Sequence, residues 1–121
     1  MIETPLALPC GARITNRLCK AAMTEGLADP SGRPTEALNQ LYGLWSDGGA
    51  GLLLSGNVQI DALHLERPGN VVVEDEPSER MQAALAAWAA AGTRATGVRR
   101  GAARKARSLT CRLFLAAPAA A

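Results

Sequence analysis

The stretch Asn16–Gly26, "NRLCKAAMTEG", predicts a short strand that runs directly into a turn. We expect the strand over residues 17–24, because small and apolar residues continue there until the breakers of residues 25–35, "EGLADPSGRPT", begin. Met23 and Thr24 then stand where the strand ends, which is where open and closed parallel sheets carry their sites.

A helix is predicted directly after this loop. Its apolar residues recur at i, i+3, i+4 and i+7, which places them on one helix face: Leu38, Leu41, Tyr42 and Trp45. Thr35 is the expected N-cap, and Gly48 and Gly49 are the expected stop. The glycines of "GGAG" (48–51) follow a helix and precede a strand, so they do not form a dinucleotide-binding fingerprint.

The next segment, "AGLLLSGNVQI" (50–60), predicts a strand buried on both faces, because residues 52–54 are three consecutive leucines. A short apolar piece at 71–73 precedes a second predicted helix, which ends at Gly92 and has one apolar face: Met81, Ala84, Leu85 and Trp88. Residues 4–16 predict two short extended pieces around Pro9 and Gly11, a lead-in hairpin.

The order strand, helix, strand, helix indicates an α/β fold, since a helix between two strands permits a right-handed crossover and a parallel pair. Two such units leave the sheet open, so the pattern is the opening of a larger architecture. The continuation after Gly92 should be a third buried strand, and the sequence predicts none. We therefore expect one structured part, residues 1–92, and a different segment, residues 93–121.

Charge marks the same boundary. Residues 1–93 hold six Lys/Arg and all eleven acids, a net charge of −5, whereas residues 94–121 hold seven Lys/Arg and no acid. Three explanations remain open for this Ala/Arg-rich tail: a basic segment that binds nucleic acid or a surface, a disordered extension, or translation out of frame from a GC-rich gene. Reading the gene in its other frames after residue 92 would test the last. Phe114 is the tail's only aromatic residue, so stacking platforms for nucleic acid are lacking and that partner is not expected.

Cysteine and histidine usage excludes several classes of site. Cys10, Cys19 and Cys111 have no metal-ligand spacing, and His64 is the only histidine, so neither a metal site nor a His-based triad is predicted. An odd number of cysteines without a signal peptide favours reduced thiols in a cytoplasmic protein. No apolar run approaches the roughly 20 residues of a membrane span, so no membrane partner is expected.

Two loops are candidate binding segments, because each begins where an apolar strand ends. The first begins at Ala22-Met23-Thr24 and the second at Ser55-Gly56-Asn57. Backbone amides and one hydroxyl in these positions suit a planar heteroaromatic ligand with carbonyl and ring-nitrogen edges. A threonine after a strand is also a common turn residue, and a glycine often serves only the turn.

Four motifs together carry a family resemblance. "ITNRLCKAAMTEG" (14–26), "GRPT" (32–35), a helix containing Tyr42 and "DGGAGLLLSGNVQI" (47–60) closely resemble the start of the old yellow enzyme family. Its members are FMN-dependent NAD(P)H:flavin oxidoreductases related to 2,4-dienoyl-CoA reductase. The resemblance covers residues 4 to 92 and implies a truncated TIM (β/α)8 barrel: its first two βα units with an amino-terminal lead-in hairpin.

The resemblance also implies a cofactor and a reaction. FMN would lie at the carboxyl-terminal mouth of the barrel, take a hydride from NAD(P)H and pass it to the β-carbon of an activated alkene, a small-molecule substrate. Carried over by position, Ala22 and Met23 border the flavin, Thr24 hydrogen-bonds its O4 edge, and the Gly56 amide meets the same edge. Gly56 would have to be small because the ring lies close.

Departures from the family limit what this chain does alone. Ala22 stands where many members have proline. These 121 residues contain no match for several features of the family: the glutamine on the third strand, the substrate-binding and proton-donating residues, and the phosphate-binding loops. No catalytic residue is therefore assigned. We expect an inactive fragment that folds poorly by itself, because sheet edges and one apolar face stay open. The alternative is a non-catalytic small protein whose basic tail binds nucleic acid or an acidic partner.

Overall fold

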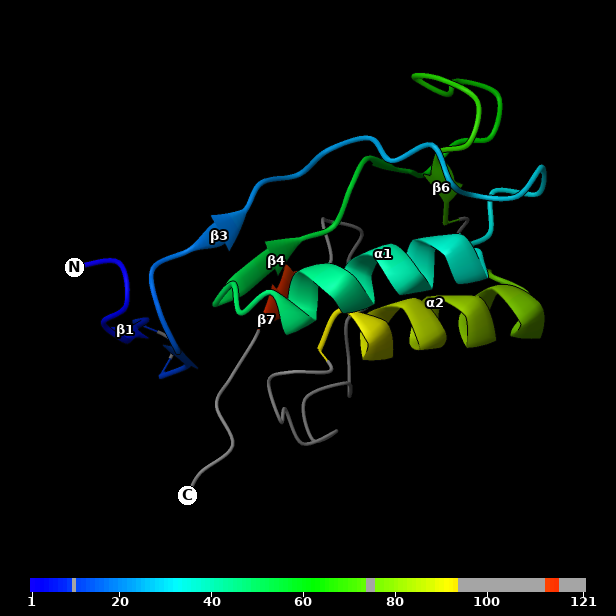
Figure 1. Cartoon of the computed structure of the whole chain (residues 1–121). Helices are drawn as coiled ribbons and strands as arrows, with labels where there is room; N and C mark the ends of the chain where they lie inside the picture. The colour runs from blue at the N-terminus through cyan, green and yellow to red at the C-terminus, as the bar shows by residue number, and fades with distance from the viewer. Residues whose placement is uncertain (10, 74–75, 94–112, 116–121) are drawn as a thin grey trace.

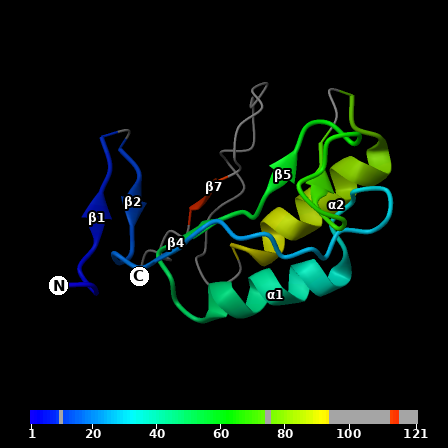
Figure 2. The same cartoon turned by 90° about the horizontal axis from the view of Figure 1, so that it is seen from above.

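Two helices pack side by side against one side of a short parallel pair of strands (Figure 1). The computed structural model describes residues 1–9, 11–73, 76–93 and 113–115. The chain begins with an antiparallel hairpin of β1 (Leu6–Ala7) and β2 (Arg13–Ile14), as the sequence predicts. Gly11 allows the turn with a φ of 85°. Figure 2 shows this hairpin lying apart from the two helices.

The central strands form the predicted parallel pair. β3 (Cys19–Lys20) pairs with β4 (Leu52–Leu54) so that Cys19 lies opposite Leu52 and Lys20 opposite Leu53. The helix α1 (Glu36–Asp47) connects them, which is the crossover expected between parallel strands. The regular part of β3 is shorter than the predicted span 17–24, because in the described residues β3 has a strand partner on one edge only.

The ends of α1 follow the predicted signals. Thr35 accepts a hydrogen bond from the Leu38 amide at 3.4 Å and donates one to the Leu27 carbonyl at 2.6 Å. Gly48 closes the other end, and its amide bonds the Leu44 carbonyl. The cap therefore also fastens the preceding loop to the start of the helix.

A second parallel pair follows, and here a loop instead of a helix joins the two strands. β5 (Val58–Gln59) and β6 (Val71–Val72) pair in parallel, and α2 (Glu79–Ala91) comes after both. Ser78 caps α2, and Gly92 ends it as predicted. Neither helix in the described part of the chain is long and apolar enough to cross a membrane.

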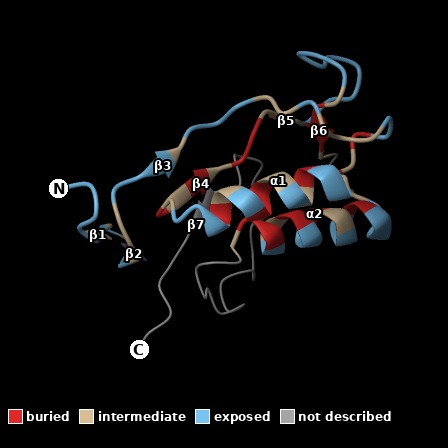
Figure 3. Cartoon of the chain, in the orientation of Figure 1, coloured by how far each residue is buried: buried red, intermediate tan, exposed pale blue. Residues whose placement is uncertain are grey.

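The core lies between the helices and the strands, where Figure 3 shows the buried faces of both helices turned inward. Tyr42 is fully buried, and its ring meets Trp45 and Trp88 edge to face, with centroids 5.0 and 5.1 Å apart. Both predicted apolar faces thus contribute to one cluster of buried side chains: Leu38, Tyr42, Leu53, Val71, Met81, Leu85 and Trp88.

β4 differs from its prediction in one respect. Leu53 is fully buried against the helices, whereas Leu52 and Leu54 are half-buried. Side chains alternate along a strand, so these two point to the side opposite the helices. The prediction of burial on both faces is therefore wrong for the described chain, since no described helix covers that second side.

A strand also forms where the sequence predicts none. β7 (Leu113–Leu115) pairs with the free edge of β4, and it runs antiparallel to β4. An apolar triplet can satisfy the open hydrogen-bonding edge of β4 from either direction. The other residues of the predicted tail, 94–112 and 116–121, lie outside the described residues.

The capping contacts of Thr35 lead to a stability prediction. Thr35→Ala removes an acceptor for the Leu38 amide and a donor to the Leu27 carbonyl, so the free energy of unfolding should fall by about 1–2 kcal/mol. Thr35→Ser keeps both bonds and should stay near the parent value. Urea unfolding followed by circular dichroism measures both variants, and equal losses would contradict the assignment of the cap.

Candidate functional site

The four predicted site residues converge on one hollow. Ala22, Met23 and Thr24 come from the loop after β3, and Gly56 comes from the loop after β4. All four line an open hollow of about 390 Å³, together with Asn57 and Val58. Parallel pairing of β3 with β4 causes this, because it brings both carboxyl ends to the same side of the sheet.

Gly56 has a structural reason to lack a side chain. A Cβ atom built on it would overlap the Met23 carbonyl and the Glu25 carboxylate. The first loop therefore lies directly against the Gly56 backbone. This contact is a second reason for glycine here, besides the closeness of a ring that the resemblance implies.

The loop between β5 and β6 contacts both of these loops on the same side. The Ala28 amide donates to the Gly69 carbonyl at 3.0 Å, and a Cβ on Gly69 would meet the Gly26 backbone. Gly69 adopts a φ of 86°, which glycine tolerates without strain. Asn70, 2% exposed, accepts from the Arg67 amide and donates to the Asn57 carbonyl. The walls of the hollow are thus fastened to each other.

An acidic side chain lies close to the same hollow. Glu66 forms an ion pair with Arg67 at 2.9 Å on the exposed loop between β5 and β6. Hydrogen bonding with Arg67 is the main cause that lowers the pKa of Glu66, and the side chains of Thr24 and Asn57 lower it further. Glu66 is therefore ionised at neutral pH, on the side of the loop that faces Thr24.

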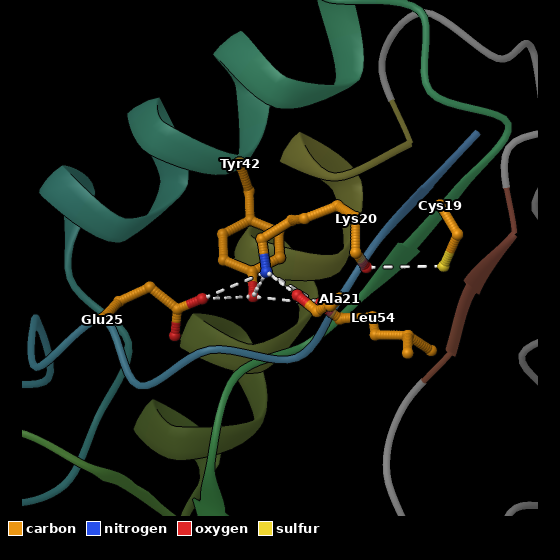
Figure 4. A network of polar contacts seen from close by, with 6 residues as sticks. All are labelled: Cys19, Lys20, Ala21, Glu25, Tyr42 and Leu54. Carbon is orange, nitrogen blue, oxygen red and sulfur yellow. Dashed lines mark hydrogen bonds and ion pairs between the residues drawn. The ribbon is translucent and has the colours of Figure 1, made fainter.

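A buried polar cluster lies beneath the first loop (Figure 4). The ammonium group of Lys20 is surrounded by four oxygen acceptors: Ala21 O at 2.9 Å, Leu54 O at 3.0 Å, Glu25 Oε1 at 3.4 Å and the Tyr42 hydroxyl at 3.5 Å. The Tyr42 hydroxyl donates to the same Glu25 oxygen at 2.8 Å. The side chains of Lys20 and Glu25 are only 9% and 8% exposed. Two strands, one loop and one helix thus meet at this cluster.

The sequence did not reveal the Lys20–Glu25–Tyr42 cluster. Tyr42 was expected as one more apolar contact, and Lys20 and Glu25 were not singled out. One signal was available: a lysine inside a predicted strand, opposite a helix face that carries a tyrosine and a tryptophan. The ammonium lies 4.4 Å from the centroid of the Trp45 ring, so the aromatic face receives the cation.

The other titratable pair on the second loop lies outside the hollow. His64 and Asp61 are exposed and 2.5 Å apart, and hydrogen bonding to His64 is the main cause that lowers the pKa of Asp61. Within the described residues, no three His, Cys, Asp or Glu side chains gather in a way that could hold a metal ion.

Curated relatives match about 70% of the chain. An "NADH-dependent flavin oxidoreductase iliE" from Neonectria sp. (strain DH2) is 40% identical over 88 residues, and the protein of that name from Hypocrea jecorina (strain QM6a) is 33% identical over 84. These matches cover 72% and 69% of this chain but 12% and 20% of the relatives. No family profile matches.

A solved structure shares the fold. The old yellow enzyme homologue from Zymomonas mobilis superposes with a TM-score of 0.67 and 24% sequence identity, covering 80% of this chain and 26% of that one. The chain therefore shares the fold of part of an old yellow enzyme homologue, and its sequence is similar to part of two curated flavin oxidoreductases. The predicted fold class, a truncated TIM barrel with its first two βα units, is confirmed.

The old yellow enzyme match explains the open side of the sheet. A complete barrel has about 250 residues and eight strands, and the side chains on the inner faces of those strands fill its interior. Leu52 and Leu54 point to the side that becomes this interior, whereas Leu53 points to the helix layer. The hollow then lies at the carboxyl ends of the first two barrel strands, at the mouth where such barrels carry their sites.

The overlap at Gly56 yields a second prediction. Gly56→Ala should destabilise the chain by about 1–3 kcal/mol and displace the loop of Met23 and Glu25, because the new methyl group has no room. Gly49→Ala is the control: its Cβ would meet nothing within 4 Å, so only the cost of its φ of 82° remains. Urea unfolding gives the free energies, and amide chemical shifts report the loop. An unshifted Met23 amide in Gly56→Ala would refute the contact.

Proposed function

We propose that the chain supplies the first two strand–helix units of an FMN-dependent NAD(P)H:flavin oxidoreductase of ene-reductase type. In this proposal Ala22, Met23, Thr24 and Gly56 border one edge of the flavin ring. The bound cofactor would accept a hydride from NAD(P)H and transfer it to the β-carbon of an activated alkene such as an enone, a small-molecule substrate.

One observation carries the proposal: residues from two separate strand ends open on the same hollow. Thr24 offers a hydroxyl, which can donate or accept, and Gly56 brings its backbone close without a side chain in the way. Within the described residues that line the hollow, none is basic. The lining therefore suits the neutral edge of a heteroaromatic ring better than a phosphate group.

The residues named here would act on the cofactor by binding and orienting it. A hydrogen bond from Thr24 to a ring carbonyl oxygen would influence the reduction potential, which is how a protein adjusts a flavin. The side chain of Met23, which is 49% exposed in this chain, would cover part of that ring edge and limit how closely water approaches it. No residue of this chain is proposed as a proton donor.

The 121-residue chain is proposed to be inactive alone, because two units offer one ring edge and leave the rest of a flavin exposed. Mixed with FMN and then desalted, the purified chain should lose its yellow colour. A visible spectrum after desalting checks this, and a retained, shifted flavin band would contradict it. Free FMN in the same column buffer gives the reference spectrum.

A chimera tests the site itself. Residues 4–92 of this chain replace the aligned segment of the Neonectria relative, and the chimera should retain FMN and oxidise NADH. Thr24→Ala in the chimera should weaken FMN binding about three- to tenfold, the loss of one hydrogen bond. Thr15→Ala, outside the hollow, is the matched control. A chimera that folds but binds no FMN would overturn the proposed function, and equal affinities would remove Thr24 from the site.

A further inference from the structure

The buried Lys20–Glu25–Tyr42 cluster lies directly beneath the proposed flavin edge. Glu25 follows Thr24 in the chain, and its carboxylate uses both oxygens near the site. Oε1 receives Tyr42 and Lys20, while Oε2 lies against the Gly56 backbone. A single carboxylate therefore touches both loops that border the hollow.

Stability alone does not explain a buried ion pair here. Removing an ammonium and a carboxylate from water is costly, and apolar residues of similar volume often stabilise a protein as well or better. Here hydrogen bonds offset the cost, because the three N–H groups of Lys20 have four oxygen acceptors within 3.5 Å. Such fully satisfied networks allow one geometry, since any displacement leaves a buried polar group without a partner.

The geometry that this cluster specifies is the spacing of the two strand ends. Lys20 leaves β3 and reaches the Leu54 carbonyl at the end of β4, and so bridges the two strands next to their loops. Tyr42 is held by edge-to-face contacts with Trp45 and Trp88, so its hydroxyl has a defined position. The helix layer thereby determines where Glu25 sits.

We infer that Lys20, Glu25 and Tyr42 are positioning residues that set the distance between Thr24 and Gly56 across the hollow. Their role toward a flavin rests on the proposed function, whereas the spacing is a property of this chain. Glu25 contacts Gly56 and follows Thr24 in the chain, and none of the three cluster residues lines the hollow itself. Lys20 and Tyr42 both bond the Glu25 carboxylate. These two act through Glu25.

The contact between Glu25 and Gly56, through which the cluster sets this distance, can be measured in the full 121-residue chain by NMR. In the parent, nuclear Overhauser cross-peaks should connect the α-protons of Gly56 with the side chain of Glu25. Tyr42→Phe should abolish them while the ring contacts of residue 42 with Trp88 persist, because only the hydroxyl is lost. Leu85→Val is the control: it weakens the same core through packing alone and should keep the cross-peaks. Cross-peaks absent from the parent, or unchanged in Tyr42→Phe, would overturn the inference.

A second variant separates position from stability. Lys20→Met keeps an apolar chain of similar length but removes the charge and all four hydrogen bonds. Urea unfolding should show a lower midpoint than in the parent, because the buried carboxylate of Glu25 loses its ammonium partner. The Gly56–Glu25 cross-peaks should also be lost, whereas Leu85→Val, destabilised by packing alone, should keep them. Cross-peaks that survive in a folded Lys20→Met chain would mean that the ion pair positions nothing.

The FMN-loaded chimera connects the spacing to the ligand. Tyr42→Phe there should raise the FMN dissociation constant about three- to tenfold and change the position of the flavin band, whereas Leu85→Val should leave both unchanged. If the chimera binds no FMN, the proposed function fails, and the cross-peaks in the 121-residue chain still decide the inference. If FMN binds equally well to all variants, the inference toward the cofactor is wrong.

Discussion

The buried ammonium of Lys20 is the constraint on which the arrangement of this chain depends. A cation in that place requires oxygen acceptors, and Glu25 and the carbonyls of Ala21 and Leu54 meet the requirement. Ala21 follows β3 directly, Glu25 lies in the loop after β3, and Leu54 ends β4. Satisfying one charge therefore places a loop, two strands and, through Tyr42, the first helix.

The walls of the hollow follow from that arrangement. Glu25, in the loop after β3, lies against Gly56 in the loop after β4, and its carboxylate is also bonded to Tyr42. If the first loop moved away from the second, the hydrogen bond between Glu25 and Tyr42 would break. Gly56 lets these two loops approach closely, and Gly69 lets the loop between β5 and β6 approach the first of them. Buried Asn70 accepts from the Arg67 amide and donates to the Asn57 carbonyl. The side facing Thr24 stays open, with room for a ligand edge.

Local signals were sufficient to predict both helices, since 3.6-residue periodicity, a capping side chain and a terminal glycine all act within a few residues of each other. Strand lengths were predicted less well, because pairing depends on partners that are distant in sequence. Among the described residues β3 has a strand neighbour on one edge only, and β7 pairs with β4 in the direction opposite to a barrel strand. An edge accepts either direction, so no local pattern around residues 113–115 could have predicted this pairing.

The sequence by itself determined the strand–helix order, the helix ends and the two loops that line the hollow, through periodicity and turn residues. It also determined the match to old yellow enzymes, because the motifs recur in order. Only the tertiary structure decided that Lys20, Glu25 and Tyr42 meet, and that glycine at 56 is required by a neighbouring loop. These hydrogen bonds join residues 5 to 34 positions apart in the chain. Packing of the folded chain brings such residues together, and no local sequence pattern predicts it.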